Sequence, residues 1–269
     1  MSQTPFDIFA ALHQQAQPLV LANAWDAGSA LLCQNAGAKA VATSSAGVAW
    51  ARGYADGTLV PHAELLDTVA GIQRVLSLPL SVDLEAGYSD DPAQVAKLVL
   101  ELAELGVVGI NLEDGDEAPE LLIAKIKAIR DALGPRGFFI NARTDVYLHQ
   151  LKAPDECLQE SLARALRYQE AGTSGVFIPA ILAADEIQQA VDVINVPLNV
   201  LALPGLPSYQ ELAQMGVKRV SAGSGPFLTA FYHARHYMQS YHQGQWLPRP
   251  DDALQYPEMN QLVLDAQPE

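Results

Sequence analysis

Three acidic residues and one arginine stand where short apolar runs in the middle of the chain end. They are Asp83, Glu85, Glu113 and Arg143. Residues two apart on a strand point to the same side, so we expect the side chains of Asp83 and Glu85 to share a face. Carboxylates at that spacing repel each other unless a cation, a proton or an arginine lies between them. With no Cys or His nearby, the pattern offers only oxygen ligands, which suit Mg²⁺ or Mn²⁺ better than Zn²⁺.

The elements that must position these residues follow a repeating pattern. A β-rich apolar run is followed by a turn and then by a stretch with helical periodicity, at intervals of roughly 30 residues. The expected strands are residues 19–22, 40–43, 80–83, 108–112, 138–141, 175–178, 198–201 and 219–221. The clearest helical stretches are residues 61–76, 92–105, 119–133 and 154–171. Alternating strands and helices predict parallel pairing, and about eight such units favour a closed (β/α)₈ TIM-type barrel over an open doubly wound sheet.

In a barrel of this kind the chemistry sits at the carboxyl ends of the strands. Asp83, Glu85 and Glu113 would then reach one mouth, beside Arg143 and a Ser-Ser-Ala-Gly turn at residues 44–47. Each residue also has a simpler explanation, because an acid after a strand often caps the next helix and a lone arginine can form a structural ion pair. The joint pattern on adjacent strands favours a functional site.

The composition excludes several classes of protein. The 269 residues carry a formal net charge of −15, and 49% of them are hydrophobic, which is not the composition of a disordered chain. Two cysteines, Cys33 and Cys157, are too few for a disulfide scaffold. The acidic balance argues against nucleic-acid binding and against docking on anionic membranes. No signal peptide and no apolar run of membrane-spanning length are visible, so we expect a cytoplasmic protein with one barrel domain over residues 1–269.

Five sequence motifs carry a resemblance to a known family. They are residues 23–26 (Asn-Ala-Trp-Asp), 43–48 (Thr-Ser-Ser-Ala-Gly-Val), 82–88 (Val-Asp-Leu-Glu-Ala-Gly-Tyr), 109–114 (Gly-Ile-Asn-Leu-Glu-Asp) and 141–145 (Asn-Ala-Arg-Thr-Asp), with weaker matches at 203–205 and 219–223. Together they resemble the isocitrate lyase/phosphoenolpyruvate mutase superfamily. The resemblance implies a modified barrel whose eighth helix is exchanged between the subunits of a homotetramer. Here that helix would be residues 226–241, within a C-terminal helix and tail at about 225–269.

The resemblance also implies roles for individual residues. The ligands of Mg²⁺, some of them acting through water, would be Asp83, Glu85 and Glu113. The catalytic residues would be Arg143, which clamps a substrate carboxylate or a developing oxyanion, and Asp56. The seat for the substrate would be formed by Trp25, Ser45, Ala46 and Gly47.

The loop after the fourth strand departs from the lyases of this family. Those enzymes carry a Lys-Arg-Cys-Gly-His type loop whose Cys acts as acid and base, whereas residues 113–120 read Glu-Asp-Gly-Asp-Glu-Ala-Pro-Glu. Both cysteines of the chain fall in expected helices, so cleavage of isocitrate or methylisocitrate is not expected. The loop also lacks the Lys of the phosphonate enzymes, and its acids would repel a phosphonate.

We therefore expect a Mg²⁺-dependent lyase-type enzyme that cleaves a C–C bond of a small α-keto acid or dicarboxylate, as in oxaloacetate decarboxylation, through a pyruvate-type enolate. A phosphonomutase or phosphonopyruvate hydrolase is the alternative within the family, and a non-catalytic keto-acid binder is the alternative without catalysis. A Schiff-base aldolase is disfavoured because none of the six lysines ends a central strand at the mouth. A phosphate cradle at residues 221–226 is disfavoured because no Lys or Arg follows it closely.

Overall fold

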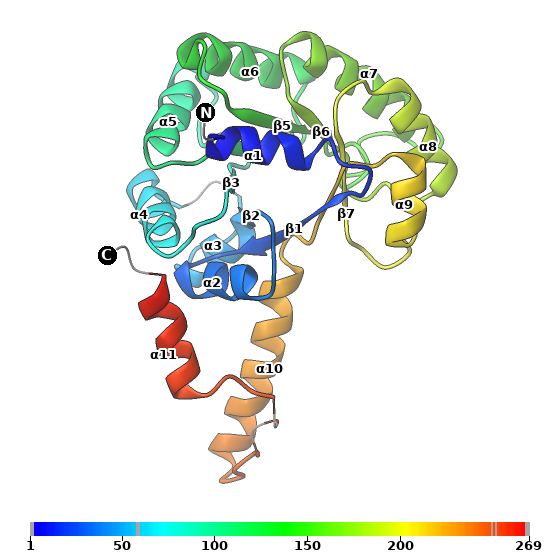
Figure 1. Cartoon of the computed structure of the whole chain (residues 1–269). Helices are drawn as coiled ribbons and strands as arrows, with labels where there is room; N and C mark the ends of the chain where they lie inside the picture. The colour runs from blue at the N-terminus through cyan, green and yellow to red at the C-terminus, as the bar shows by residue number, and fades with distance from the viewer. Residues whose placement is uncertain (1–2, 58–59, 249, 251, 267–269) are drawn as a thin grey trace.

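Eight parallel strands close into a barrel in the computed structural model, which describes residues 3–57, 60–248, 250 and 252–266 (Figure 1). The strands are β1 (Leu19–Ala24), β2 (Val41–Thr43), β3 (Leu80–Asp83), β4 (Gly109–Glu113), β5 (Phe139–Arg143), β6 (Gly175–Phe177), β7 (Leu198–Leu201) and β8 (Arg219–Ser221). The helices are α1 (Pro5–Leu12), α2 (Ala27–Asn35), α3 (Ser45–Ala51), α4 (His62–Gln73), α5 (Pro92–Glu104), α6 (Pro119–Leu133), α7 (Cys157–Glu170), α8 (Ala184–Val193), α9 (Tyr209–Met215), α10 (Gly225–His242) and α11 (Tyr256–Asp265). The expected (β/α)₈ barrel is confirmed, and the open sheet is wrong, because β8 pairs with β1.

The register of the strands sets the level of the site. In β4 and β5 five residue pairs are in register, and Glu113 lies directly beside Arg143. Asp83 at the end of β3 pairs with Asn111 on β4. Because the strands are parallel, these carboxyl ends bring the two carboxylates and the guanidinium to one end of the barrel, as the sequence predicts.

The crossover helices begin and end where the sequence signals it. α5 starts after Asp91, whose carboxylate accepts a hydrogen bond from the N–H of Ala93 at 2.9 Å. It ends before Gly106, whose φ of 90° is strained for any other residue. The side chains that α5 buries are Val95, Ala96, Leu98, Val99, Leu102 and Ala103. Each large aliphatic among them contributes about 1.5–3 kcal/mol of transfer free energy, which holds α5 on the barrel.

A helix that the sequence does not predict closes the amino end of the barrel. α1 begins with a capping box in which Thr4 and Asp7 each bond the other's backbone N–H. Phe9 of α1 is fully buried, and its ring meets the ring of Phe139 edge to face at 5.4 Å. Because Phe139 opens β5 and Arg143 ends it, α1 covers the end of the barrel opposite to the carboxylates.

α10 extends away from the barrel instead of completing its outer ring, and α11 runs back toward α2 (Figure 1). α10 confirms the helix expected at residues 226–241, and within it Phe227 and Ser240 are the buried side chains. The α10 side chains that are at least half exposed include Leu228, Phe231, Tyr232, Met238 and Tyr241. The sequence does not predict α11, because the tail is polar and contains several prolines. In the part of the chain that the structure describes, no helix is long and apolar enough to cross a membrane.

Candidate active site

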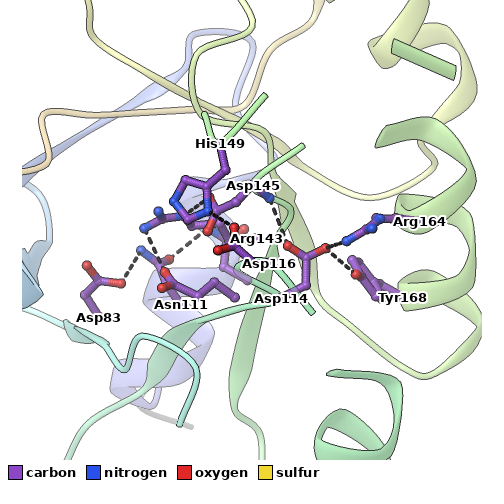
Figure 2. Close-up of polar contacts among 11 residues, drawn as sticks. Asp83, Asn111, Asp114, Asp116, Arg143, Asp145, His149, Arg164 and Tyr168 are labelled. Carbon is purple, nitrogen blue, oxygen red and sulfur yellow. Dashed lines mark hydrogen bonds and ion pairs between the residues drawn. The ribbon is translucent and has the colours of Figure 1, made fainter. Parts of the chain in front are cut away.

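Arg143 lies between two carboxylates at the carboxyl end of β5 (Figure 2). Its Nη1 is 2.8 Å from Oε2 of Glu113, and its Nε donates to Oδ1 of Asp145 at 2.6 Å. The guanidinium carbon lies 5.8 Å from the ring centroid of Phe177. Burial alone would lower the pKa of Arg143, but the two carboxylates raise it above its ordinary value, so the arginine stays charged. Nη2 makes no hydrogen bond with any residue in the described ranges, and this donor remains for a substrate.

Asp83 is held by groups from two neighbouring strands. Its Oδ2 accepts a hydrogen bond from the N–H of Ser45 at 3.2 Å, and its Oδ1 accepts one from the amide of Asn111 at 3.4 Å. Its own N–H donates to the hydroxyl of Thr43 at 2.8 Å. A carboxylate fixed by donors on both oxygens is oriented in advance for a cation.

Glu85 does not lie on the strand. β3 ends at Asp83, and Glu85 has a φ of 50°, so the alternation that would turn both side chains to one face stops before it. Its Oε1 accepts a hydrogen bond from the hydroxyl of Tyr88 at 2.9 Å, and its carbonyl accepts the N–H of Glu113 at 3.0 Å. The turn is held from outside by Lys125, whose Nζ donates to the carbonyl of Ala86 at 2.7 Å.

Glu113 is the acid most affected by this crowding. Burial raises the pKa of Glu113 to about 8; Arg143 opposes the shift, whereas the negative charges of Asp83, Asp145 and Glu85 add to it. The mouth therefore holds more carboxylates than its one arginine can neutralise.

The chemistry of these donors fits a hard divalent cation. The candidate ligands are carboxylates, and a dication would relieve the repulsion that raises the pKa of Glu113. The arrangement is not closed around a single point. Within residues 3–57, 60–248, 250 and 252–266, no three His, Cys, Asp or Glu side chains converge closely enough to hold a metal by themselves. Ligation in which water molecules fill part of the shell, as Mg²⁺ prefers, is the mode that this spacing allows.

The turn at residues 44–47 is the first turn of α3. Ser44 caps the helix, and its Oγ accepts the N–H of Gly47 at 3.3 Å. The N–H of Ser45 goes to Asp83, as described above. The N–H of Ala46 makes no hydrogen bond within the described ranges and points from a helix N-terminus, where anions bind favourably. Among the three residues expected to seat the substrate carboxylate, Ala46 therefore has a backbone N–H available. The N–H groups of Ser45 and Gly47 already donate to Asp83 and Ser44.

Trp25 and Asp56 border this seat on two sides. A Cβ at Gly47 would lie 3.1 Å from Cβ of Trp25, which explains the glycine, and the Trp25 ring contacts that of Phe227 at 5.1 Å. Asp56 is exposed on the loop after α3. Partial desolvation of its carboxylate and the negative charge of Asp83 raise the pKa of Asp56, while Arg143 and hydrogen bonds from Gly57 and Ser45 oppose the shift.

An imidazole–carboxylate pair, which the sequence does not predict, joins the loop after β4 to the loop after β5. Nδ1 of His149, from the loop after β5, lies 2.7 Å from Oδ1 of Asp116 (Figure 2). The backbone N–H of His149 donates to the carbonyl of Asp145 at 2.8 Å, so the imidazole is anchored to the residue that pairs with Arg143. The only sign in the sequence is that His149 falls on a loop after a barrel strand.

Polar residues also fill the barrel beneath the mouth. Nη2 of Arg219, which is 1% exposed, donates to Oδ1 of Asn111 at 3.0 Å, and the amide of Asn141 donates to the same oxygen at 2.9 Å. Burial lowers the pKa of Arg219 to about 9, and Asp83 opposes this shift. Asn111 therefore links a buried cation to Asp83. An arginine that opens an apolar strand is the only sign of this in the sequence.

Two backbone donors of the phosphate cradle considered for residues 221–226 are already used within the protein. The N–H groups of Ala222 and Gly223 both donate to Oδ1 of Asn23, at 2.8 and 3.0 Å. No lysine in the described part of the chain lies on a barrel strand: Nζ of Lys125 is bonded to the Ala86 carbonyl from outside the barrel, and Lys152 lies on the loop after β5. Neither observation favours the cradle or the Schiff-base aldolase.

A parallel barrel with carboxylates on β3 and β4 and an arginine on β5 defines a class of enzymes, and comparison with known proteins identifies the family. The sequence profile of phosphoenolpyruvate phosphomutase matches residues 9–242. The chain therefore belongs to the isocitrate lyase/phosphoenolpyruvate mutase superfamily, as its motifs predict.

Individual relatives differ in the activities for which they are named. An uncharacterized protein of Mycobacterium tuberculosis H37Rv is 37% identical over 96% of both chains. The 2-methylisocitrate lyase of Escherichia coli K12 is 30% identical over 72% of this chain and 69% of its own. The oxaloacetate decarboxylase of Pseudomonas entomophila L48 is 28% identical over 65% and 63%.

Two solved structures share the fold. A "putative phosphonomutase" of Burkholderia cenocepacia J2315 is 37% identical with a TM-score of 0.82, over 87% of this chain and 99% of its own. Phosphonopyruvate hydrolase, solved with oxalate and Mg²⁺, has a TM-score of 0.85 over 98% and 96% but is only 22% identical, so it supports the fold alone.

Proposed function

We propose that this protein is a Mg²⁺-dependent lyase that cleaves a C–C bond of a small α-keto acid, with oxaloacetate decarboxylation as the simplest such reaction. The observation that carries the proposal is the register pairing of Glu113 with Arg143 beside Asp83, at a mouth whose β4 loop is acidic. That mouth offers ligands for a cation and one fixed guanidinium for an anion. Its β4 loop offers no Lys or Cys for phosphonate or isocitrate chemistry.

The proposed metal ligands are Asp83, Glu85 and Glu113, and Mn²⁺ is the expected substitute for Mg²⁺. When bound, the dication would supply Lewis-acid stabilisation of negative charge on the keto oxygen. The other steps rest on the protein's own residues. The Nη2 group of Arg143 donates to the substrate carboxylate or to the oxygen on which charge develops. The N–H of Ala46, at the start of α3, is a second donor for the same anion.

The electrons and the proton can be followed through the reaction. The bond between the departing carboxylate and its carbon breaks, CO₂ leaves, and the electron pair moves to the keto oxygen to give the enolate of pyruvate. The enolate carbon then takes a proton. We propose the imidazolium form of His149 as the donor, because Asp116 accepts from Nδ1–H and the proton on Nε2 is then the one given to the carbon.

Two other functions are favoured by specific observations. The resemblance to the B. cenocepacia protein favours phosphonate chemistry, and the acidic loop at residues 114–117 disfavours it by repulsion. The missing Cys loop favours a binder that retains the keto-acid pocket without turnover. A ³¹P-detected phosphonate product would support the first, and oxalate binding without pyruvate release from any keto acid would support the second.

Replacement of Asp83 tests the proposal directly. We expect Asp83→Ala to lower metal-dependent release of pyruvate from oxaloacetate at least about 10²-fold, because a preorganised electrostatic group is removed. Asp91→Ala is the matched control, since this carboxylate lies on the same β3–α5 segment but caps α5. It should cost about 1 kcal/mol of stability and leave turnover unchanged.

Circular dichroism and the thermal transition would show that both variants remain folded. Turnover that survives in Asp83→Ala, or that chelation of divalent metal does not affect, would remove the proposal.

A further inference from the structure

Asp114, the residue after Glu113, is a fully buried carboxylate with three donors. Its Oδ2 accepts from Nη1 of Arg164 at 2.9 Å and from the hydroxyl of Tyr168 at 2.5 Å, and its Oδ1 accepts the N–H of Asp145 at 2.9 Å (Figure 2). Arg164 and Tyr168 both belong to α7, one helical turn apart, and both are buried. Two side chains of a helix on the outside of the barrel thus meet on one carboxylate next to the mouth.

Asp114 also holds the backbone that follows Arg143. Its N–H donates to the carbonyl of Arg143 at 3.2 Å, and its side chain bonds the N–H of Asp145, two residues further on. Asp145 in turn accepts from Nε of Arg143 at 2.6 Å. The backbone that follows Arg143, and the carboxylate that orients its guanidinium, therefore depend on the position of Asp114.

The contacts of Arg164 extend to the loop after β4. Its Nη1 also donates to the carbonyl of Glu117 at 3.1 Å, and its Nε donates to Oε1 of Glu160 at 2.7 Å. A buried ion pair is rarely a better source of stability than apolar packing of the same volume. Its value lies in fixing geometry, and here the geometry that it fixes is that of the mouth.

We propose that Asp114, Arg164 and Tyr168 are positioning residues that set the orientation of the Arg143 guanidinium through Asp145. The proposal rests on the function proposed above, in which Arg143 holds the carboxylate of the substrate. α7 then acts on binding from outside the pocket, with no contact to the ligand.

Oxalate, a dicarboxylate that resembles the enolate of pyruvate in shape and charge, is the probe. Isothermal titration in the presence of Mg²⁺ would compare the wild type with Tyr168→Phe and Arg164→Met. We expect the dissociation constant to rise about 10- to 100-fold for Arg164→Met, since small misplacement of a clamp has effects of this size, and less in the same direction for Tyr168→Phe.

Arg167→Met is the matched control. Arg167 lies on the same helix, and its Nη2 pairs with Oε1 of Glu120 at 2.7 Å, but this pair is on the surface, with side chains 42% and 66% exposed. The control should bind oxalate within about twofold of the wild type, because an exposed pair contributes little.

Crystal structures of the variants supply a second readout that a merely structural role would not move. We expect the contact between Nε of Arg143 and Oδ1 of Asp145 to lengthen or break in folded Tyr168→Phe. Wild-type affinity for oxalate with this contact intact in Tyr168→Phe would overturn the proposal, even if Arg164→Met fails to fold. If the wild type does not bind oxalate but the variants displace Arg143, the proposed function fails and the positioning role stands.

Discussion

Arg143 is held on two edges of its guanidinium, by Glu113 from the neighbouring strand and by Asp145 from its own side of the barrel. This arrangement keeps the cation charged and aims it without help from a ligand, which lowers the cost of organising the site when a substrate arrives. The same crowding makes the neighbouring acids sensitive to pH. Two predictions belong to this scale.

The first concerns the proton donor. His149→Gln should lower the turnover number about 10²- to 10⁴-fold with little change in KM, since general acid catalysis contributes a factor of this size and acts after binding. Steady-state kinetics of pyruvate formation would measure it. His242→Gln, at the end of α10, is the control and should behave as the wild type. An unchanged turnover number in His149→Gln would assign the proton to another donor.

The second concerns Glu113, whose pKa is about 8 in the folded protein against an ordinary value of 4.5. The native state binds this proton more tightly than the unfolded chain does. Its contribution to stability is therefore complete below about pH 4.5 and is lost as the pH rises through 8. Urea unfolding in the presence of a chelator should show the wild type losing stability relative to Glu113→Gln over that window. If the free energy of unfolding depends on pH in the same way for the two proteins, the raised pKa of Glu113 is contradicted.

At the scale of elements, the barrel depends on close contact between β4 and β5. A Cβ at Gly109, which opens β4, would lie 2.7 Å from the carbonyl oxygen of Phe139 and 2.9 Å from its Cβ. Because a backbone atom cannot move aside cheaply, the strand register that pairs Glu113 with Arg143 requires glycine at this position.

Gly109→Ala should therefore lower the free energy of unfolding by about 1–3 kcal/mol, the usual cost of overpacking. Gly71→Ala is the matched control. Gly71 lies inside α4, where an added Cβ would meet no atom within 4 Å, so the alanine should raise stability by about 0.5–1 kcal/mol through helix propensity. Chemical denaturation of both variants would measure the difference. Equal effects of the two substitutions would mean that β4 and β5 can separate.

The sequence predicts elements of regular period better than it predicts turns. All eight strands are found within two residues of their expected bounds, because parallel barrel strands are continuous apolar runs. The start of α3 is predicted as a turn because Ser-Ser-Ala-Gly favours a turn as strongly as a helix start. Glu85 lies beyond the end of β3 with a positive φ, which a period of two cannot reveal.

The candidate site is predictable in its acids and arginine but not in their partners. Asp83, Glu113 and Arg143 each follow an apolar run, and parallel pairing alone brings them together. The partners of Asp114 come from positions 50 and 54 residues further along the chain, on α7. No local pattern connects such distant residues, so the sequence alone assigns no role to Asp114.

At the scale of the whole molecule, α10 leaves part of the barrel uncovered. A groove of about 590 Å³ runs along β1 between α2 and α9, and its apolar lining includes Leu19, Val20, Leu32 and Tyr209. Val20 on β1 is 59% exposed, although a barrel strand is normally covered by helices. α10 itself exposes large aromatic side chains, among them Phe231, Tyr232 and Tyr241. We propose that copies of the chain exchange α10 in a homotetramer, as the family resemblance implies.

Sedimentation equilibrium should then find a species of four 28.9-kDa chains. Phe231→Glu, on the exposed face of α10, should dissociate it, because a charge would be buried without a partner. Val193→Glu, at the exposed end of α8, is the control and should leave the assembly intact. A monomer in the wild type would show that the aromatic face serves another purpose.

The link from α7 to Arg143 has a practical consequence for changing the substrate range of this enzyme. Engineers usually randomise the residues that line a pocket, where most replacements damage either catalysis or folding. Under the positioning role proposed above, Glu160 on the outer helix would act on a guanidinium that it does not contact, through Arg164 and Asp114. A mutant library confined to α7 would tilt the clamp by small steps while every residue of the mouth keeps its identity.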